Sequence, residues 1–194
     1  MNAETLGAQL AALPGARVRA ADHAAVGYDL DVALPESSLL AAVGIMDGAG
    51  YFIEGMTGVD WLGECEALRK EAEAKAKKAA EAAGSAETAG AAPQAEAPAQ
   101  DPIPQEDELE AEDELEVVYD FNRYAARHRV CLRVRTPRSN PQIHTIAEIY
   151  PIAHWHEREI HEFFGIVFLG HPYLIPLLLP EDAEYHPLLK DYSA

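Results

Sequence analysis

Cysteine is scarce in this sequence, which has only Cys65 and Cys131 among its 194 residues. Neither belongs to a Cys-x-x-Cys pair, the spacing used by structural zinc sites, iron–sulfur clusters and dithiol redox centres. The sequence therefore predicts two free thiols in a reducing compartment and no centre built on sulfur ligands.

Long apolar runs are missing as well. A membrane helix needs about 20 consecutive apolar residues, whereas the longest apolar stretch here, residues 173–179, contains Pro176 and is followed by Pro180. The first residues lack the basic segment and unbroken apolar core of a secretory signal. We expect a soluble, cytoplasmic protein that reaches a membrane only through other proteins.

Basic residues are few, with 15 lysines and arginines against 33 aspartates and glutamates and a formal net charge of −18. Nucleic acids and anionic lipids reward lysine and arginine, so neither is expected as the primary partner. The glycine patterns of dinucleotide and phosphate loops are absent, and so is the Gly-x-Ser-x-Gly elbow of hydrolases. Composition and motifs thus argue against nucleotide-binding and serine-hydrolase sites.

The acidic residues concentrate in the middle of the chain. Residues 64–116 hold 16 acidic and 5 basic side chains, first among alanines without an apolar stripe and then among prolines. Such a composition buries too little apolar surface to offset the chain entropy lost on folding. We predict that residues 64–115 form a flexible, disordered insert; the alternative is an acidic arm that binds a basic partner.

Periodic patterns flank this insert on both sides. Helical spacing predicts helices over residues 4–13, 35–46 and 145–150 and one from about residue 154, and alternation predicts strands over residues 27–34, 51–62, 116–121 and 128–135. Two glycines in the second strand indicate a bulge or bend. The sequence predicts an α+β fold with a small mixed sheet of about four strands and flanking helices.

Four segments follow from these patterns. Residues 1–63 form the N-terminal half of the α+β domain, 64–115 the insert, 116–169 the C-terminal half, and 170–194 an extended tail. The tail is too rich in proline for regular structure. We expect it to lie on the surface of a partner.

The stretch HWHEREIHEFFG, residues 154–165, resembles a zinc helix. A zincin needs histidines at i and i+4, but His161 stands five residues after His156, which puts the two rings about 140° apart on a helix. His154, Glu157 and His161 share a face, which we interpret as a solvated face. A stand-alone metal hydrolase using these three side chains is the distant alternative.

The same helix has an apolar arc. Ile160, Phe163 and Phe164 are expected to face a core, with His156 packed among them. Arg158 and Glu162, four residues apart, are placed for an ion pair.

Four segments carry a family resemblance: TGVDWLG (57–63), EVVYDFNR (116–123), LRVRTPRSNPQIHTIAEIYPIAHWHEREIHEFFGIVFLGHP (132–172) and LLLPEDAEYHPLLKDY (177–192). In that order they resemble the 30 kDa, or C-type, subunit of complex I. That family includes the homologous subunits of energy-converting nickel–iron hydrogenases and formate hydrogenlyases. The likeness skips the insert.

The resemblance implies a structural and assembly subunit without catalytic residues or a cofactor of its own. It would pack on the large catalytic subunit and the iron–sulfur subunit of an oxidoreductase and meet the membrane subunits indirectly. Iron–sulfur clusters and a nickel–iron centre or a quinone site would belong to those partners. The resemblance thus places the chain on the cytoplasmic face of the inner membrane.

The signature and interface residues implied by the resemblance lie in the helix and the tail. They are Glu157, Arg158, Glu159, Phe164, Gly165, Gly170, His171, Pro172, Pro180, Lys190, Asp191 and Tyr192. The three charged residues of the helix would divide between intramolecular and intersubunit ion pairs. The glycines and the His-Pro pair would shape the turn that begins the tail.

The chain departs from the quinone-reductase pattern in its tail. Those members carry an acidic and two basic residues around a leucine after Gly-His-Pro, where this chain has Tyr173 to Pro176, and an arginine before the lysine that corresponds to Lys190. These differences favour the hydrogenase or formate hydrogenlyase branch. The alternative is the same subunit in a proton-pumping NADH:quinone oxidoreductase.

Overall fold

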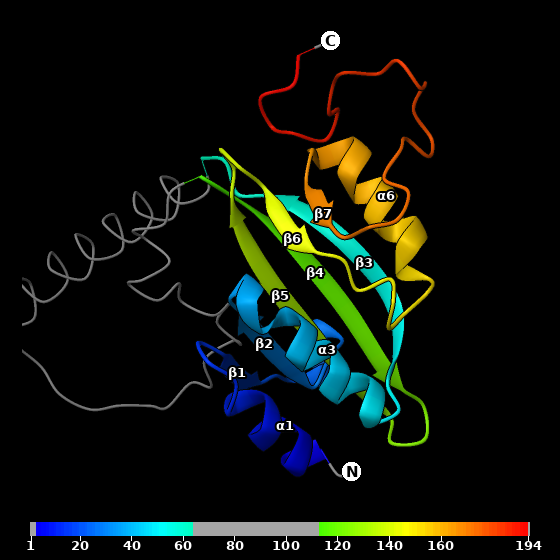
Figure 1. Cartoon of the computed structure of the whole chain (residues 1–194). Helices are drawn as coiled ribbons and strands as arrows, with labels where there is room; N and C mark the ends of the chain where they lie inside the picture. Colours follow the sequence, from blue (N-terminus) through cyan, green and yellow to red (C-terminus); the bar gives the residue numbers. More distant parts are fainter. Residues whose placement is uncertain (1–2, 64–112, 194) are drawn as a thin grey trace, which may run out of the picture. The chain divides into compact units, whose positions relative to one another are not determined.

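A computed structural model describes residues 3–63 and 113–193, and a five-stranded mixed sheet organises them (Figure 1). The strand order is β1-β2-β5-β4-β3, and a parallel pair, β6-β7, forms a second small sheet. The strands are β1 Arg17–Ala20, β2 Leu30–Leu34, β3 Phe52–Asp60, β4 Glu114–Arg123, β5 His128–Pro137, β6 Gln142–His144 and β7 Val167–Leu169.

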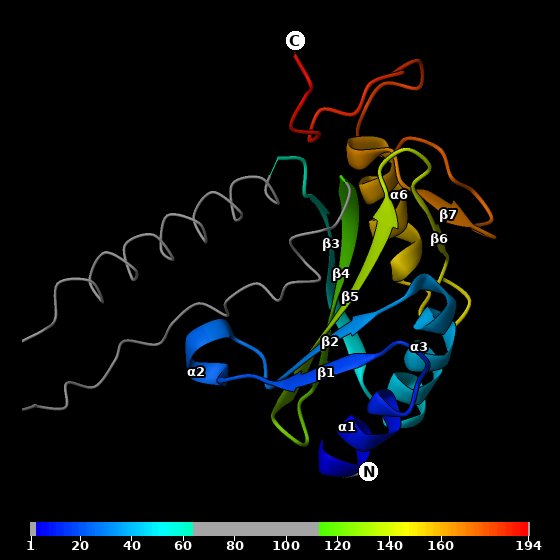
Figure 2. The same ribbon diagram turned by 90° about the vertical axis from the view of Figure 1, so that its left-hand side faces the viewer.

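Three longer helices cover one side of the main sheet (Figure 2). They are accompanied by one short helix and one 3-10 turn. The helical segments are α1 Ala3–Ala11, α2 His23–Val26, η1 Glu36–Ser38, α3 Leu39–Gly48 and α6 Ala153–Phe164. The predicted α+β class is therefore confirmed.

Alternation in β4 and β5 decides which face of the sheet is covered. Val130, Leu132 and Val134 of β5 stand opposite Phe121, Tyr119 and Val117 of β4, and all six are almost fully buried. Cross-strand partners point to the same side of a sheet, so these pairs form one continuous apolar layer. α1 and α3 pack on this layer through leucines and a methionine: Leu6, Leu10, Leu39 and Met46.

Charged residues occupy the other face of β5. Arg133 lies 2.9 Å from the carboxylate of Asp31 on β2, and Arg135 lies 3.3 Å from that of Glu116 on β4. Cys131 on this face is free, and burial raises the pKa of its thiol to about 12, so it stays protonated near neutral pH. This face of β5 therefore carries cross-strand ion pairs.

The structure differs from the sequence prediction in four short elements. β1, α2, β6 and β7 were not predicted, because segments of three or four residues carry no measurable periodicity. The main sheet consequently has five strands rather than about four. The helix predicted over residues 145–150 is wrong: this segment is a turn, in which the N–H groups of Ile149 and Tyr150 donate to the carbonyl of Ile146.

Other expectations agree with the structure. The register of β3 on β4 shifts between Ile53 and Gly55, which confirms the predicted bulge in this strand. Nearly all of the predicted insert, and Cys65 with it, lies outside the described residues. Within residues 3–63 and 113–193, none of the helices has the length and apolar character needed to cross a bilayer.

Candidate functional site: helix α6 and the C-terminal tail

After β7 the chain forms a tail without helix or strand, and this tail folds back over the C-terminal end of α6 (Figure 1). It begins at Gly170, whose φ of +83° belongs to the left-handed region that favours glycine. The extended tail predicted from its prolines is confirmed. It lies on this chain's own helix, which the sequence did not predict.

Two charged side chains of α6 hold the first part of the tail. The guanidinium of Arg158 donates to the carbonyl oxygens of Ile175 and Pro176, at 2.9 and 2.8 Å. One turn later, the carboxylate of Glu162 accepts the N–H groups of three consecutive tail residues at 2.7 to 3.1 Å: Leu177, Leu178 and Leu179. We call these two side chains the backbone clamp, because their hydrogen bonds go to main-chain atoms.

Aromatic rings flank the cation of the clamp. The guanidinium carbon of Arg158 lies 5.4 Å from the ring centroids of both Trp155 and Tyr173. Contacts of this length are attractive, because the ring faces carry negative charge density. Both rings expose more than half of their surface, while Arg158 itself is 7% exposed.

The end of α6 holds the second part of the tail. Gly165 ends the helix with a φ of +76°, and its N–H donates to the carbonyl of His161. A side chain at Gly165 would lie 2.9 Å from the ring of His186, so glycine is required here for space as well as for conformation. His186 binds the carbonyl of Glu162, and the N–H of Leu188 donates to the carbonyl of Phe163.

An ion-pair network fixes the last residues of the tail. Arg138, in the turn after β5, lies 3.1 Å from the carboxylate of Asp60 and 2.6 Å from that of Asp191. The carboxylate of Asp60, at the end of β3, also accepts the N–H of Lys190 at 2.8 Å. Asp191 is exposed, and the hydrogen bond from Arg138 lowers the pKa of its carboxyl group.

Glu157 has a different role on the same helix. Its side chain is fully buried and accepts hydrogen bonds from the hydroxyl of Thr145 and, at 2.8 Å, from the N–H of Ile146. These residues lead from β6 into α6. Burial raises the pKa of Glu157 from 4.5 to about 7, although the two hydrogen bonds favour the ionised form.

Two histidines lie beside this carboxylate. The ring of His171 is fully buried, with Nε2 3.9 Å from Glu157 and 3.3 Å from the carbonyl oxygen of His154. Its Nδ1 accepts the N–H of Tyr173 at 3.1 Å, so this ring nitrogen is unprotonated in the structure. Burial lowers the pKa of His171, which favours the neutral ring. His171 thus contacts the start of the tail.

The helical-wheel prediction for α6 is only partly right. Ile160 is buried as expected, and His156 and Phe164 are half-buried. Glu157, which we placed on a solvated face, is buried, because the β6–α6 connection and the tail cover a second side of the helix. Among the described residues, the predicted ion pair between Arg158 and Glu162 does not form, since both side chains bind the tail.

The remaining signature residues differ in exposure. Glu159 points to solvent, and so do Pro172, Pro180 and Tyr192, the last stacked on Tyr185 with 5.7 Å between ring centroids. Phe164 packs against the backbone of β3 at Gly58, where a side chain would lie 2.5 Å from the phenyl ring. The signature therefore combines buried residues that hold the fold with exposed ones.

Sequence reasoning missed several residues of this site. Asp60 and Arg138 stand at a strand end and in a turn, and Thr145 lies in a predicted helix, so none carried a pattern pointing to the tail or to α6. Glu162 was noticed only as a neighbour of Arg158. For Asp60 the sequence did contain a signal. It is an acidic residue at an inward-facing position of β3, and a buried acidic residue suggests a partner.

His154, Glu157 and His161 do not converge on one point. Glu157 binds the β6–α6 connection, and the Nδ1 of His161 lies 2.9 Å from the carbonyl of Ile166. Within residues 3–63 and 113–193, no group of three metal-ligating side chains has a geometry that could hold an ion.

Fold and site together define a small α+β domain that carries a clamped C-terminal tail. Residues 59–194 match the family described as respiratory-chain NADH dehydrogenase, 30 kDa subunit. The match covers more than half of the chain, so the chain belongs to this family.

Named relatives match part of the chain. It is 51% identical over 75 residues to the C-type subunit of the NADH-quinone oxidoreductase of Roseiflexus castenholzii, which covers 39% of this chain and 43% of that protein. The same subunit of Mycolicibacterium paratuberculosis is 45% identical over 75 residues, 39% of this chain and 32% of the relative. The chain thus aligns with less than half the length of these relatives.

Two solved structures share the fold. A trypsin-resistant fragment of Nqo5 superposes with a TM-score of 0.54 and 22% identity over 90% of this chain and all of the fragment. A chain of a membrane-bound sulfane sulfur reductase, an archaeal respiratory membrane complex, has a TM-score of 0.63 and 19% identity over 98% of this chain and 84% of its own length. At these identities the likeness concerns the fold.

Proposed function

We propose that this chain is a non-catalytic subunit of the hydrophilic arm of a membrane-bound, complex I-like oxidoreductase. It docks on the large catalytic subunit, beside the iron–sulfur subunit, through α6 and the tail. In this proposal the complex lies on the cytoplasmic face of the membrane, and its redox cofactors belong to the neighbouring subunits. Family membership and the preformed tail support the proposal.

One observation on the surface carries it. Of the eleven large apolar side chains that are exposed in the described residues, eight lie between residues 152 and 192. They are Ile152, Trp155, Val167, Tyr173, Leu178, Tyr185, Leu188 and Tyr192. Apolar and aromatic residues gathered on one region are typical of protein interfaces, whereas scattered ones need no explanation.

The branch of the family is the finer question. The names of the relatives support an NADH-quinone oxidoreductase, and we propose that branch first. The hydrogenase or formate hydrogenlyase branch is the second candidate, because the tail has Tyr173 to Pro176 in place of charged residues and Leu189 in place of arginine before Lys190.

Affinity purification tests the proposal. The tagged full-length chain, expressed in its own organism, is isolated from detergent-solubilised membranes, and its companions are identified by mass spectrometry. We expect a large catalytic subunit in equal amount. NADH-quinone reductase activity without nickel would support the first branch, and stoichiometric nickel the second. A free monomer found only in the soluble fraction would contradict both.

A further inference from the structure

The tail is attached to α6 mainly through its main chain. The backbone clamp binds carbonyl oxygens at residues 175 and 176 and N–H groups at residues 177 to 179, and the N–H of Leu188 binds the helix end. Hydrogen bonds to main-chain atoms do not depend on which side chains the tail residues carry. The clamp therefore fixes the path of the tail and leaves several of its side chains unused.

Some of these side chains are apolar and point to solvent. Leu178 is 66% exposed and Leu188 53% exposed, although each donates its N–H to α6. Their neighbours Leu174 and Leu189 instead pack against the core. The tail thus divides into inward leucines that pack against the core and outward leucines whose surface is mostly exposed.

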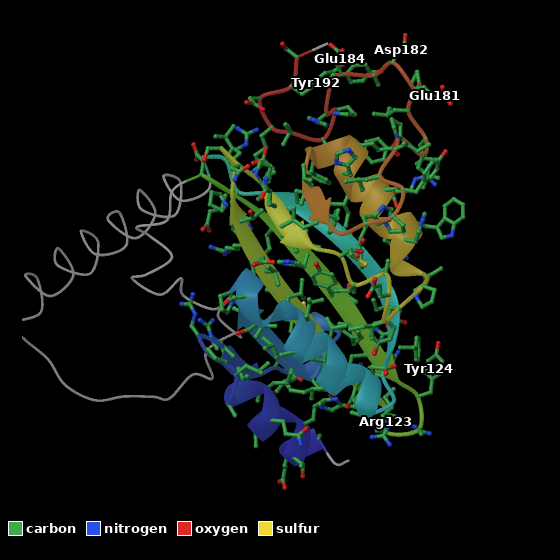
Figure 3. All side chains as sticks on the ribbon, viewed as in Figure 1. Arg123, Tyr124, Glu181, Asp182, Glu184 and Tyr192 are labelled. Carbon is green, nitrogen blue, oxygen red and sulfur yellow. The ribbon has the colours of Figure 1, made fainter. Side chains whose placement is uncertain are left out.

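Between the two anchored segments, residues 180–185 form a projecting loop. The N–H of Ala183 donates to the carbonyl of Pro180 and closes a turn at its tip. Glu181, Asp182 and Glu184 are exposed and lie at the outer margin of the molecule (Figure 3). Within the described part of the chain, these three carboxylates have no cation partner, in contrast to Asp191.

We propose that the backbone clamp presents Leu178 and Leu188, with the acidic loop between them, as the specificity surface for a protein partner that has an apolar depression edged by lysine or arginine. This inference rests on the proposed function and names the chemistry of its docking site. The clamp supplies rigidity, and the outward side chains select the partner.

Charge decides between a protein and a membrane as the occupant. Three unpaired carboxylates beside the apolar groups repel an anionic lipid surface but attract a basic protein surface. A preformed loop also avoids the entropy of ordering a free segment on binding, so a small surface is sufficient for useful affinity. The occupant we infer is therefore a basic-edged protein surface, that of the large subunit.

Three full-length variants test the inference. The display variant carries Leu178→Ser and Leu188→Ser, and the charge variant carries Glu181→Gln, Asp182→Asn and Glu184→Gln. The control, Leu40→Ser, removes an exposed leucine, 44% accessible, from α3. Binding to the purified large subunit is measured at low and high salt, and amide hydrogen exchange at residues 177–179 reports on the clamp.

We expect the display variant to bind at least about tenfold more weakly at both salt concentrations, because apolar anchors dominate interface energies. The charge variant should lose roughly three- to tenfold at low salt and almost nothing at high salt, because salt screens exposed charges. Leu40→Ser should bind like the wild type. Amide exchange at residues 177–179 should remain slow in all three.

The outcomes separate the two proposals. If the wild type binds the large subunit and the display variant binds equally well, the inference is overturned while the proposed function stands. If the charge variant binds more tightly, the partner is not basic and the inference is likewise overturned. If the wild type does not bind the large subunit at all, the proposed function itself fails.

Discussion

Helices α3 and α6 cover the same side of one sheet but bury different chemistry. The buried side chains of α3 are all apolar: Leu39, Ala42, Val43 and Met46. Three of the five buried residues of α6 are charged: Glu157, Arg158 and Glu162, beside Ala153 and Ile160. The two helices are similar in length, so the difference in their buried side chains reflects what each helix packs against.

The surroundings of the two helices explain this difference. α3 packs on the sheet and on α1, where backbone groups are already paired within strands and helices. α6 also contacts the β6–α6 connection and the tail, whose N–H and C=O groups have no regular partners. Buried backbone groups need hydrogen bonds, and charged side chains that reach several of them at once supply these. In this chain, buried charged side chains of α6 supply the hydrogen bonds of the irregular segments that pack on it.

The largest effect on stability is expected at the apolar helix, α3. Leu39→Ala should lower the free energy of unfolding by about 3 kcal/mol, because a fully buried leucine leaves a cavity. The loss should be global, so that denaturant unfolding followed by far-UV and aromatic signals shifts by the same amount. Leu40→Ala, at the exposed neighbour, should change stability by no more than about 0.5 kcal/mol. A purely local effect of Leu39→Ala would contradict the comparison.

The second effect on stability depends on pH and comes from a buried charged residue of α6, Glu157. Because the folded state raises the pKa of Glu157 from 4.5 to about 7, it binds a proton more tightly than the unfolded chain. The stability from this group is therefore complete below pH 4.5 and is lost as the pH rises towards 7, by up to about 3 kcal/mol.

Glu157→Gln should remove this dependence. Relative to the wild type, the variant should gain stability between pH 5 and pH 8, measured by urea unfolding at both values. Glu159→Gln, at an exposed residue of the same helix, serves as the control and should keep the wild-type profile. Parallel profiles for wild type and Glu157→Gln would show that burial of this carboxylate is not linked to folding.

The smallest effect on global stability is expected at the clamp. Glu162→Ala removes the acceptor of three N–H groups, but the freed tail can bind water instead. Amide exchange at residues 177–179 should become about 10- to 100-fold faster, while the sheet amides of β4 and β5 keep their protection. Glu159→Ala is the matched control and should leave the tail unchanged. Equal acceleration in the sheet would mean that tail and core form one cooperative unit.

Much of the fold could be predicted from periodicity. The alternation of Val130, Leu132 and Val134 identified β5, and the spacing around Ile160 identified α6. The three-residue strands β6 and β7 could not be predicted, since they pair with each other across α6 and not with a sequence neighbour. Residues 145–150 were wrongly predicted as helix because their helical spacing comes from a single buried turn.

The site was predictable in part. The resemblance pointed to Glu157, Arg158 and Gly165, and the structure gives each a contact that explains it: the β6–α6 connection, the tail carbonyls and the ring of His186. The helical-wheel prediction put Glu157 on a solvated face because it assumes that each helix has one buried side. α6 has two.

By itself, the sequence determined the α+β class, the main strands, the long helices, the lack of regular secondary structure in the tail and the family. These follow from local spacing, composition and motif order, which are properties of the sequence and do not depend on tertiary contacts. Only the tertiary structure decided that Arg158 and Glu162 bind the tail and that Glu157 is buried. Their partners are unpaired main-chain groups, every residue has such groups, and no side-chain pattern reveals which of them a fold leaves unpaired.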